Sequence, residues 1–592
     1  MAGPTPMTGV GAPVRRQNII LAAILIVVLL FGVRLVYIQV IAGPALAQTA
    51  REERTHTQII PAPRGDVVDA HGTVLATSAD TFDIVADLRQ IPSFVLRDED
   101  GEIVSRGAAA AARVLAPLLD RDRAELGAEL VGDNGYHRLL RNATPETWQA
   151  IASLGVNGIT AERTSQRVYP AGNTAGNILG WVNDEGDGAA GIESTLNSRL
   201  LGTPGSSEVE IGARGQVIPT GAQSSTPAVP GCDVHLTIDT DLQWHAQQVI
   251  DESVDTWSAA WGAVVVVEVG TGRILALADS HAVDPNSPMD TPEDSRGARS
   301  VQNAYDPGST GKVLTVLSAL EEGVVTPTSP IENPYRHTMP NGQTFTDHTE
   351  HPDQVLTTTG VLAESANTST VLIGSEMSNQ TRFEYMRNMG WGERTGMGLP
   401  GETAGILHHY SDWDGRTQYV TMFGQSVNVN LVANTQVFAT IANQGMAIPP
   451  RIIEGYTCEG AYEELQDEEP VQVVSPESSE QMIRMLESTV HEGGTGVRAA
   501  IDGYRVAGKT GTAETSDGRG GLSHRVASFV GVAPAEAPEI AVGVVVAQPS
   551  GIYGSLVAAP VFHDVTEFSL QHLGVAPSTE EPDLYPLRPE DS

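Results

Sequence analysis

The sequence predicts a membrane-anchored chain whose larger part folds outside the membrane as mixed α+β domains. Three observations lead to this fold class. One apolar run near the N-terminus is long enough to cross a bilayer. The chain has 592 residues, 41% of them hydrophobic, which is enough for two or three globular domains. Beyond the apolar run, short strand patterns and segments of helical spacing follow one another along the chain.

The apolar run predicts a transmembrane helix over residues 18–42. Its first part is small or apolar without interruption, and it resumes after Arg34, whose long side chain can reach the interface. Arg15 and Arg16 precede the run without an acidic residue, whereas "REER" and an acidic bulk follow it. The positive-inside rule therefore predicts that residues 1–17 are a cytoplasmic tail and that the remainder is extracytoplasmic. A cleaved signal peptide is the alternative interpretation of the run.

The composition excludes some functions and leaves others open. A net charge of −38 and a pI near 4.6 argue against nucleic-acid binding, which needs clustered Lys and Arg. Cys232 and Cys458 lie far apart in the sequence, and an extracytoplasmic location permits a disulfide between them without requiring it. The segment "DHTEH", residues 347–351, has metal-capable side chains but no partner cluster. A solvated loop is therefore the better interpretation, and no metal or cofactor is expected.

The first part of the exterior, residues 43–225, combines strands and helices. "DVVDAHGTVLATS" and "TFDIVADL" predict short strands around a D-A-H-G turn. Helical spacing follows in "GAAAAARVLAPLLDRDRAELGAEL" and in "ATPETWQAIASL", which a Thr cap opens. Residues 212–233 are rich in Gly, Pro and Ser and lack periodicity, so they predict a connecting loop at a domain boundary.

The second part, residues 230–575, begins with a strand and a helix in "VHLTIDTDLQWHAQQVIDESV". The run "AAWGAVVVVEVGTGRILALADS" predicts a β-hairpin with a G-T-G-R turn, and "ASFVGVAPAEAPEIAVGVVVAQP" predicts later strands. Helices are expected around residues 310–322 and 478–492. This order is that of an α+β domain with hairpins flanking a helical middle. The Pro-rich, acidic residues 576–592 predict a disordered tail.

Ser309 and Lys312 are the first candidates for chemistry. Ser309 follows a Pro-Gly pair, and apolar residues then recur at helical spacing, which predicts that Ser309 opens a buried helix. At i and i+3 the two side chains share one face, so the amine lies within reach of the hydroxyl. A desolvated amine can release its proton and accept that of the serine, which an arginine cannot do, and the helix N-terminus offers N–H groups to an oxyanion. Taken alone, however, the spacing is better explained by a helix cap and a surface charge.

The use of lysine elsewhere makes this pair specific. The chain has 35 Lys plus Arg, and because Lys occurs only at positions 312 and 509, the other 33 are arginines. Lys509 lies in "VAGKTGTAE", a predicted strand edge, and begins a K-T-G triplet. Between the two lysines, "LAESANTST" contains Ser365 and Asn367 as an S-x-N element. The order S-x-x-K, S-x-N, K-T-G is typical of serine acyl-transfer enzymes.

With these residues the chain resembles the penicillin-binding proteins, specifically the membrane-anchored class B transpeptidases. "RGDVVDAHGTVLA", "RVYPAGNTAGNILGWV" and "GAAGIESTLNSRLLGTPG" resemble motifs of the family's non-catalytic pedestal, although "DAHG" replaces the usual D-R-x-G. "LTIDTDLQ", "TGRILALA", "ASFVGVAPA" and "AAPVF" resemble the transpeptidase domain, with Asp306 where Glu is common. "FGQSVNVNLVANTQVFATIANQGMAIPPRII" is most similar to the septal, FtsI-type branch in actinobacteria.

The resemblance implies a fold with one N-terminal transmembrane helix and two domains. Residues 43–225 are then an α+β pedestal (dimerisation-like) domain. Residues 230–575 are an α/β penicillin-binding transpeptidase domain of the β-lactamase-like kind, in which helices flank a sheet.

The resemblance also implies a role for each site residue. Ser309 attacks the carbonyl between the two terminal D-alanines of a stem pentapeptide, and Lys312 is the base for that attack. Ser365 relays protons between the two lysines and the leaving amine, while Asn367 hydrogen-bonds the substrate amide and holds Lys312. The substrate carboxylate is bound by Lys509, Thr510, Gly511 and Thr512, and the oxyanion hole is formed by the backbone N–H groups of Ser309 and Thr512. The expected catalytic residues are Ser309, Lys312, Ser365, Asn367 and Lys509.

The implied partners are peptidoglycan stem peptides on lipid-linked nascent glycan, β-lactam antibiotics, and a septal membrane glycosyltransferase with other division proteins. The implied location is the cell membrane at the division septum. An elongation-type class B transpeptidase, a D,D-carboxypeptidase, and a non-catalytic division scaffold or β-lactam sensor are the alternatives. A serine β-lactamase shares the three elements but normally lacks an anchor and a large pedestal.

Overall fold

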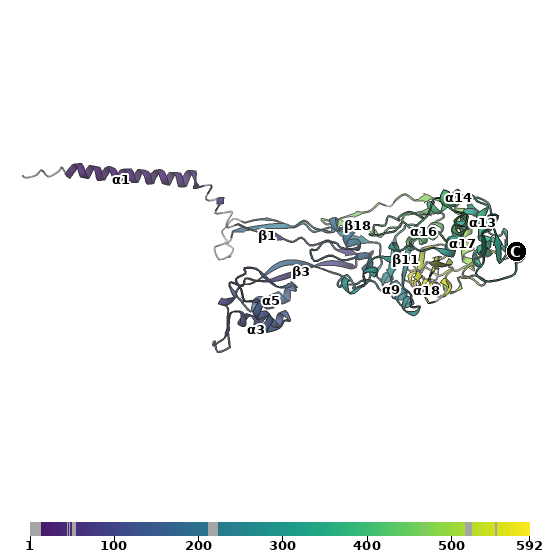
Figure 1. Ribbon diagram of the computed structural model, residues 1–592, viewed down its shortest axis with the longest axis horizontal. Coiled ribbons are helices and arrows are strands. Elements are labelled where there is room, and N and C mark those ends of the chain that lie inside the picture. The colour runs from purple at the N-terminus through teal and green to yellow at the C-terminus, as the bar shows by residue number, and fades with distance from the viewer. Residues whose placement is uncertain are drawn as a thin grey trace, which may run out of the picture. The chain divides into compact units, whose positions relative to one another are not determined.

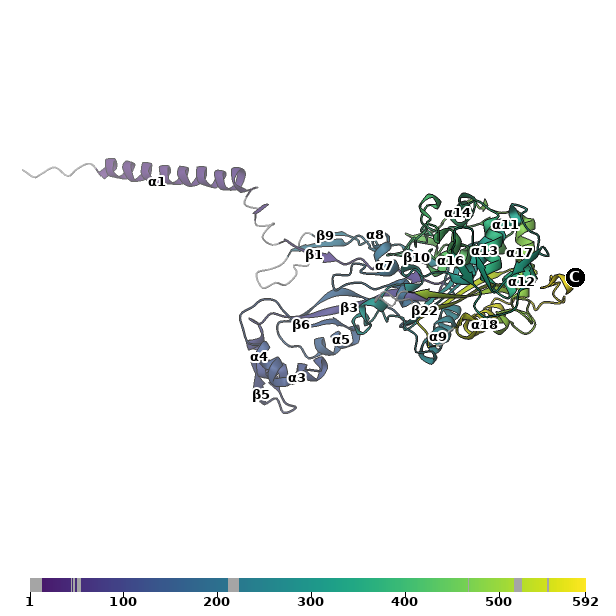
Figure 2. The same ribbon diagram turned by 45° about the vertical axis from the view of Figure 1, so that its right-hand side comes forward.

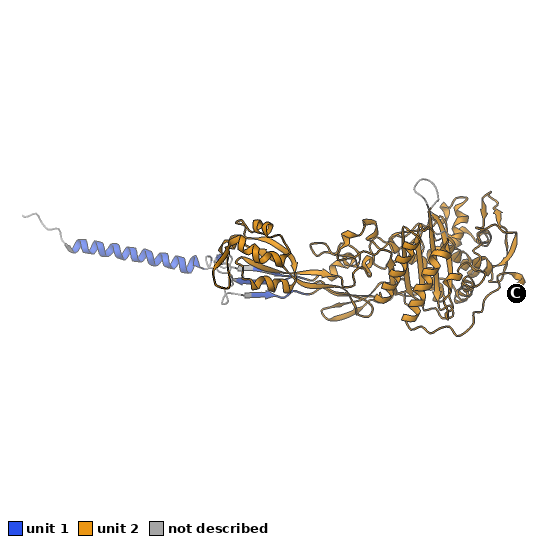
Figure 3. Cartoon of the chain, turned by 90° about the horizontal axis from the view of Figure 1, so that it is seen from below, with its two compact units in different colours: residues 1–62, 203–229 blue, residues 63–202, 230–592 orange. Residues whose placement is uncertain are grey.

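The structure, a computed structural model, describes residues 13–43, 45, 48–49, 55–210, 223–466, 468–515, 524–550 and 553–591. The expected cytoplasmic tail and the expected connector, residues 212–233, therefore lie partly outside the described residues. The chain divides into two compact units, shown in Figure 3: residues 1–62 with 203–229, and residues 63–202 with 230–592.

The first unit contains the apolar helix and a small sheet. Helix α1 spans Pro13–Val36, and a π-helical turn, Tyr37–Ile41, continues it. Together they cover the expected span and are long and apolar enough to cross a membrane. The antiparallel sheet of this unit consists of β1 (Thr55–Ile60), β8 (Gly205–Glu210) and β9 (Gln223–Thr226).

In the second unit, one long strand organises the region that the sequence predicts as pedestal. Strand β2 (Val67–Val68) and strand β3 (Val74–Ala86) are antiparallel and flank the D-A-H-G turn, as predicted. The prediction of two short strands is wrong in one respect, because the second expected strand, "TFDIVADL", is not separate: β3 continues through "TFDIVA" without a break. Strands β6 (His137–Ala143) and β7 (Ile159–Val168) both pair with the second half of β3, one on each of its edges, so the backbone groups on both sides of β3 find partners there.

Three helices pack beside these strands: α3 (Gly107–Leu119), α4 (Arg123–Glu129) and α5 (Pro145–Ser153). The stretch of helical spacing from Gly107 is two helices, because Asp120 is left-handed (φ 49°) and the Asp122 carboxylate caps α4. The Thr cap expected for α5 is present, since Thr144 accepts a hydrogen bond from the Thr147 N–H.

Three pedestal motifs meet at one buried carboxylate. Glu193 is completely buried, and the Arg64 and Arg167 Nε atoms each donate to it at 2.6 Å. Arg64 also donates to Asn197 Oδ1 at 2.7 Å, and the Tyr169 hydroxyl lies 3.4 Å from the Glu193 carboxylate. Removing one member of a buried ion pair leaves an uncompensated charge, so these segments depend on one another for stability.

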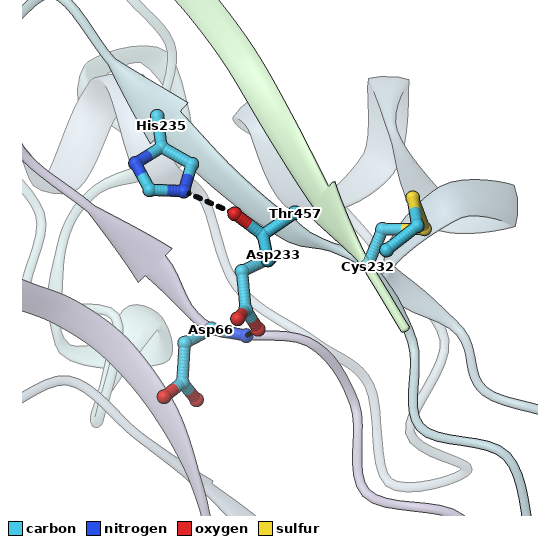
Figure 4. Close-up of a disulfide and its surroundings, with 6 residues drawn as sticks. Asp66, Cys232, Asp233, His235 and Thr457 are labelled. Carbon is cyan, nitrogen blue, oxygen red and sulfur yellow. Dashed lines mark hydrogen bonds between the residues drawn. A yellow bond between two sulfur atoms is a disulfide. The ribbon is translucent and has the colours of Figure 1, made fainter. Parts of the chain in front are cut away.

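A sheet joins the pedestal strands to the second part of the chain. Its strands run in the order β19-β18-β10-β2-β3-β6. The new members are β10 (Asp233–Leu236), β18 (Ile453–Cys458) and β19 (Ala461–Glu464). Cys232 and Cys458 form a disulfide beside the β10–β18 pair, so the pairing that the sequence left open is present (Figure 4). Close by, the Asp233 carboxylate accepts a hydrogen bond from the Asp66 N–H at 2.8 Å.

The core of the second part is a five-stranded antiparallel sheet in the order β12-β11-β23-β22-β21. Strand β11 is labelled in Figure 1 and strand β22 in Figure 2. The strands are β11 (Trp261–Glu268), β12 (Ile274–Asp279), β21 (Ala507–Thr515), β22 (His524–Ala533) and β23 (Ile540–Ala547). The β11–β12 hairpin and the two late strands confirm the predictions from their valine-rich runs.

Helices cover both faces of this sheet. On one face, Val264 and Val266 of β11 pack with α9 (Thr240–Thr256) and α18 (Gly554–His572). Val265 and Val267 point to the other face, where they pack with α11 (Lys312–Glu321) and α16 (Leu431–Ala442). An uninterrupted valine run is therefore required, because alternate residues of one strand are buried on opposite sides.

The C-terminal segment corrects the prediction of a disordered tail at residues 576–592. The Thr357 N–H donates to the Leu587 carbonyl at 3.0 Å, and Arg588 pairs with Glu364 at 2.7 Å. The Tyr585 ring packs against the core and lies 4.2 Å from the Arg484 guanidinium. A Pro-rich, acidic composition predicts disorder only when the segment finds no partners, and here backbone carbonyls and an aromatic ring provide them.

Candidate active site

Ser309 lies on a 3-10 turn, Gly308–Gly311, that leads directly into α11. Gly308 has a φ of +57°, and a Cβ at this position would lie 2.7 Å from the Thr512 carbonyl oxygen of β21. Only glycine therefore allows the turn to approach the strand this closely. The serine is consequently held at the start of a buried helix and against the strand of the K-T-G triplet.

Hydrogen bonds from the segment before α16, and from α16 itself, hold this turn in place. The Gly308 N–H donates to the Gly424 carbonyl at 2.9 Å, and residues Tyr305 and Val429 form an antiparallel bridge. Asn434 of α16 donates to the Thr310 hydroxyl at 3.1 Å. Burial raises the pKa of the preceding Asp306 carboxyl to about 6, against hydrogen bonds from the Ser426 amide and the Asn428 side chain.

Two amines share one serine hydroxyl at the centre of the site. Lys312 and Lys509 are both completely buried. The Ser365 Oγ lies 3.2 Å from Lys312 Nζ and 3.0 Å from Lys509 Nζ, and Lys312 also donates to the Ser365 carbonyl. Ser365 itself is left-handed (φ 61°) between α12 (Thr358–Ala363) and α13 (Asn367–Ser375), which turns its polar groups toward the lysines.

The environment of the two amines favours their neutral forms. Burial lowers the pKa of Lys312 to about 7, although the Asp347 carboxylate partly opposes this effect. Burial, followed by the charge of Lys312, lowers the pKa of Lys509 well below its ordinary value. Two ammonium groups beside one hydroxyl repel each other, so the pair readily releases a proton.

Asp347 belongs to this site, although the sequence favoured a solvated loop for "DHTEH". One of its carboxylate oxygens accepts the N–H groups of Asn367 at 2.6 Å and Thr368 at 3.0 Å. The other lies 3.0 Å from His351 Nε2. Asp347 thus caps α13 at the S-x-N element and is the anion that faces Lys312. No spacing pattern links residue 347 to residue 367, so this role could not be predicted from the sequence.

The K-T-G strand lies at the edge of the five-stranded sheet, because among the described residues β21 pairs with β22 on one side only. Lys509 Nζ lies 3.3 Å from the Thr510 hydroxyl, which in turn lies 3.0 Å from the Thr495 hydroxyl. Thr495 is a further residue that the motifs do not contain. The Thr512 hydroxyl accepts a hydrogen bond from the Gly554 N–H at 3.1 Å. A free strand edge can add an extended peptide as a further strand.

The structure brings most of the predicted residues together. Hydrogen bonds connect Lys312, Ser365 and Lys509, and the Ser309 turn contacts the β21 backbone. Asn367 differs from expectation in one respect. Its side chain donates to the Thr346 carbonyl at 3.1 Å, and among the described residues its hydrogen-bond partners do not include Lys312.

Comparison with known families gives two matches. Residues 262–567 match the Penicillin binding protein transpeptidase domain, and residues 59–236 match the Penicillin-binding Protein dimerisation domain.

Curated proteins and solved structures are similar over nearly the whole chain. The Penicillin-binding protein PbpB of Mycolicibacterium smegmatis is 31% identical, covering 93% of this chain and 89% of that protein. The Peptidoglycan D,D-transpeptidase FtsI of Escherichia coli is also 31% identical, covering 92% of this chain and 89% of that protein. A peptidoglycan synthetase from Bifidobacterium adolescentis is similar in structure, with a TM-score of 0.72, 34% identity, and 90% and 100% coverage. Penicillin binding protein 3 from Mycobacterium tuberculosis, complexed with aztreonam, gives a TM-score of 0.69, 26% identity, and 89% and 100% coverage.

Proposed function

The chain belongs to the class B penicillin-binding proteins, and from this premise we propose that it is a peptidoglycan D,D-transpeptidase acting through an acyl-enzyme on Ser309. The observation that carries the proposal is the shared position of the Ser365 hydroxyl, 3.2 and 3.0 Å from two buried amines. An amine that is neutral near pH 7 supplies a base, and the second amine supplies a cation for the substrate carboxylate.

The proposed acylation begins with a movement of the shared proton. In the free site, the proton favours Lys312, because Asp347 provides an anion there and Lys509 faces only another amine. A substrate carboxylate beside Lys509 reverses this preference, so the proton moves from Lys312 through the Ser365 hydroxyl to Lys509. Substrate binding thereby converts Lys312 into the base.

Neutral Lys312 then accepts the proton of Ser309 as its Oγ attacks the carbonyl carbon between the terminal D-alanines. The N–H groups of Ser309 and Thr512 stabilise the oxyanion, and the proton passes through Ser365 to the leaving D-alanine amine. An ester on Ser309 and free D-alanine result. An amine of a second stem peptide attacks this ester and loses a proton, and Ser309 regains its own, which closes the crosslink.

Thr510, Gly511 and Thr512 are proposed to bind the substrate as an added strand on the free edge of β21. Asn367 is proposed to hydrogen-bond the substrate amide through its side chain, while the backbone N–H of Asn367 donates to the Asp347 carboxylate. A β-lactam presents a strained amide and a carboxylate to the same groups, so it acylates Ser309 and deacylates slowly.

Labelled penicillin tests the nucleophile. The wild-type chain should carry one covalent label, and Ser309→Ala should carry none; a label retained by Ser309→Ala would remove Ser309 from the mechanism. Product analysis with paired stem peptides separates crosslinking from hydrolysis. Dimeric peptide supports transpeptidation, whereas monomeric tetrapeptide alone would indicate a D,D-carboxypeptidase.

We also propose that α1 is an uncleaved anchor with its N-terminus in the cytoplasm, and that the chain acts at the division septum with a membrane glycosyltransferase. A fluorescent fusion should concentrate at the septum of dividing cells, and uniform sidewall signal would favour the elongation-type alternative. The Ser309→Ala chain should still localise while crosslinking is lost. The N-terminal sequence of the membrane-bound protein distinguishes an anchor from a cleaved signal peptide.

A further inference from the structure

A second cluster of ionisable side chains lies away from Ser309, where three distant segments of the chain meet. His71 is in the D-A-H-G turn between β2 and β3, Asp239 directly precedes α9, and His572 is the last residue of α18. The two Nε2 atoms lie 3.0 and 2.9 Å from the same carboxylate oxygen, Asp239 Oδ2. All three donor atoms lie within 4.8 Å of one another, and the part of the chain that the structure describes contains one such group.

The carboxylate at the centre is buried. Its side chain is 5% exposed, and its other oxygen accepts the N–H groups of Asp241 and Leu242 at 3.0 Å as the cap of α9. The remaining oxygen of this carboxylate is directed at two imidazole nitrogens.

Contacts other than those with Asp239 fix the backbone of His71 and the imidazole of His572. The Asp69 carboxylate accepts the N–H of His71 at 2.9 Å and the hydroxyl of Thr240 at 2.6 Å, which docks the turn on the start of α9. The His572 ring stacks on Phe568, with centroids 5.7 Å apart and planes 15° apart. The three donors are thus preorganised by the turn and by α18, as a metal site requires.

The donor set defines the class of ion. Two imidazole nitrogens and one carboxylate oxygen are ligands of zinc and similar divalent transition metals, whereas calcium and magnesium take oxygen ligands. The His71 side chain is 69% exposed and that of His572 28%, so an ion has a path from solvent and room for a water ligand. Three protein ligands with an open fourth position is a known zinc arrangement.

We propose that His71, Asp239 and His572 bind one divalent ion of the zinc class. The ion joins the pedestal turn at residue 71 to two helices of the sheet core. His71 and Asp239 are 168 residues apart in the sequence, and Asp239 and His572 are 333 residues apart. Because such a site exists only when these segments are folded together, the ion stabilises the junction between pedestal and core.

The test uses the untagged full-length chain in detergent, freed of metal with a chelator and titrated with Co²⁺ alone. Wild type should bind one Co²⁺ per chain, with visible ligand-field absorption that Zn²⁺ abolishes. The double variant His71→Ala/His572→Ala should lose both the absorption and the binding. Asp239 is left unchanged because it also caps α9. The matched control is His281→Ala, which removes the histidine of an exposed pair with Asp255 and should bind as wild type does.

The single variants keep the test decisive if the double variant is misfolded, which circular dichroism without metal would reveal. His71→Ala and His572→Ala should each weaken Co²⁺ binding by more than about 100-fold, since even outer contacts of metal ligands are worth 10–100-fold. Equal Co²⁺ binding by wild type and these variants, or no binding by wild type, would mean that the cluster holds only hydrogen bonds and would overturn the proposal.

Discussion

Replacing Lys312 with arginine distinguishes two possible roles of this residue, that of a general base and that of a positive charge. At pH 8, a group with a pKa of about 7 is about 90% neutral, whereas an arginine with a pKa above 12 is neutral in fewer than about one molecule in 10⁴. The positive charge is kept and the proton acceptor is lost. General-base catalysis is worth about 10²- to 10⁴-fold, so acylation should fall by about 10²- to 10⁴-fold, or about 2.7 to 5.5 kcal/mol.

The assay is the second-order rate of acylation by a fluorescent penicillin, measured on the full-length chain between pH 5.5 and 9. For wild type, the rate should fall as the pH rises through about 7, because the free site then loses the single proton that moves from Lys312 to Lys509 when the substrate carboxylate binds. Lys312→Met provides the matched control, since it removes both base and charge. The Lys312→Arg and Lys312→Met variants should show the same decrease in acylation rate. The rate of Ser309→Ala gives the background of the assay.

One result would refute the reasoning directly. If Lys312→Arg acylates within about tenfold of wild type while Lys312→Met does not, the residue acts through its charge and not as a base. Thermal unfolding of each variant must accompany the rates, because a guanidinium in a fully buried site can cost about 1–3 kcal/mol by overpacking.

Three other changes test the parts that surround the site. Asp347→Asn keeps a hydrogen-bond acceptor for the α13 amides but removes the anion that raises the pKa of Lys312. The midpoint of the acylation pH profile should therefore move below that of wild type, while the plateau rate should stay within about tenfold of the wild-type plateau. Glu193→Gln leaves two buried guanidinium groups without their carboxylate and should lower stability by about 3–5 kcal/mol, seen as a lower Tm of the full chain. Cys232→Ser/Cys458→Ser opens a loop of 226 residues and should cost up to about 5 kcal/mol in denaturant unfolding.

Each of these has its own control. Glu185→Gln removes an exposed carboxylate of the same region and should change stability by no more than about 0.5 kcal/mol; an equal loss in both variants would show that Glu193 has no special role. Reductant should destabilise wild type and leave the double-serine variant unchanged. An unchanged pH midpoint in Asp347→Asn would show that its charge does not reach Lys312.

The sequence predicted those parts of the molecule that repeat a pattern or contain a rare residue. Uninterrupted valine-rich runs predicted the β11–β12 hairpin, because both faces of that sheet are buried and every position must be apolar. The lysines at 312 and 509 predicted the candidate site, because few side chains can be both a buried cation and a base.

Contacts between distant segments left no such pattern. Asp347 acts on an S-x-N element some 20 residues later, through backbone amides that any sequence supplies. The segment around Leu587 is ordered by hydrogen bonds to Thr357 that its composition does not indicate. The disulfide required Cys232 and Cys458 to meet on neighbouring strands, which depends on the sheet order and not on spacing.

Two buried groups of cations, one around Glu193 and one around Ser365, show why lysine is confined to the candidate site. Glu193 is held by Arg64 and Arg167, which keep their charge at every accessible pH and therefore form a permanent clamp. Ser365 lies instead between two lysines whose burial lowers their pKa values. An arginine there would keep its proton and block the transfer to Ser309, whereas a lysine at Glu193 could lose its proton and weaken the clamp. The chain thus uses arginine where charge must stay and lysine where a proton must move.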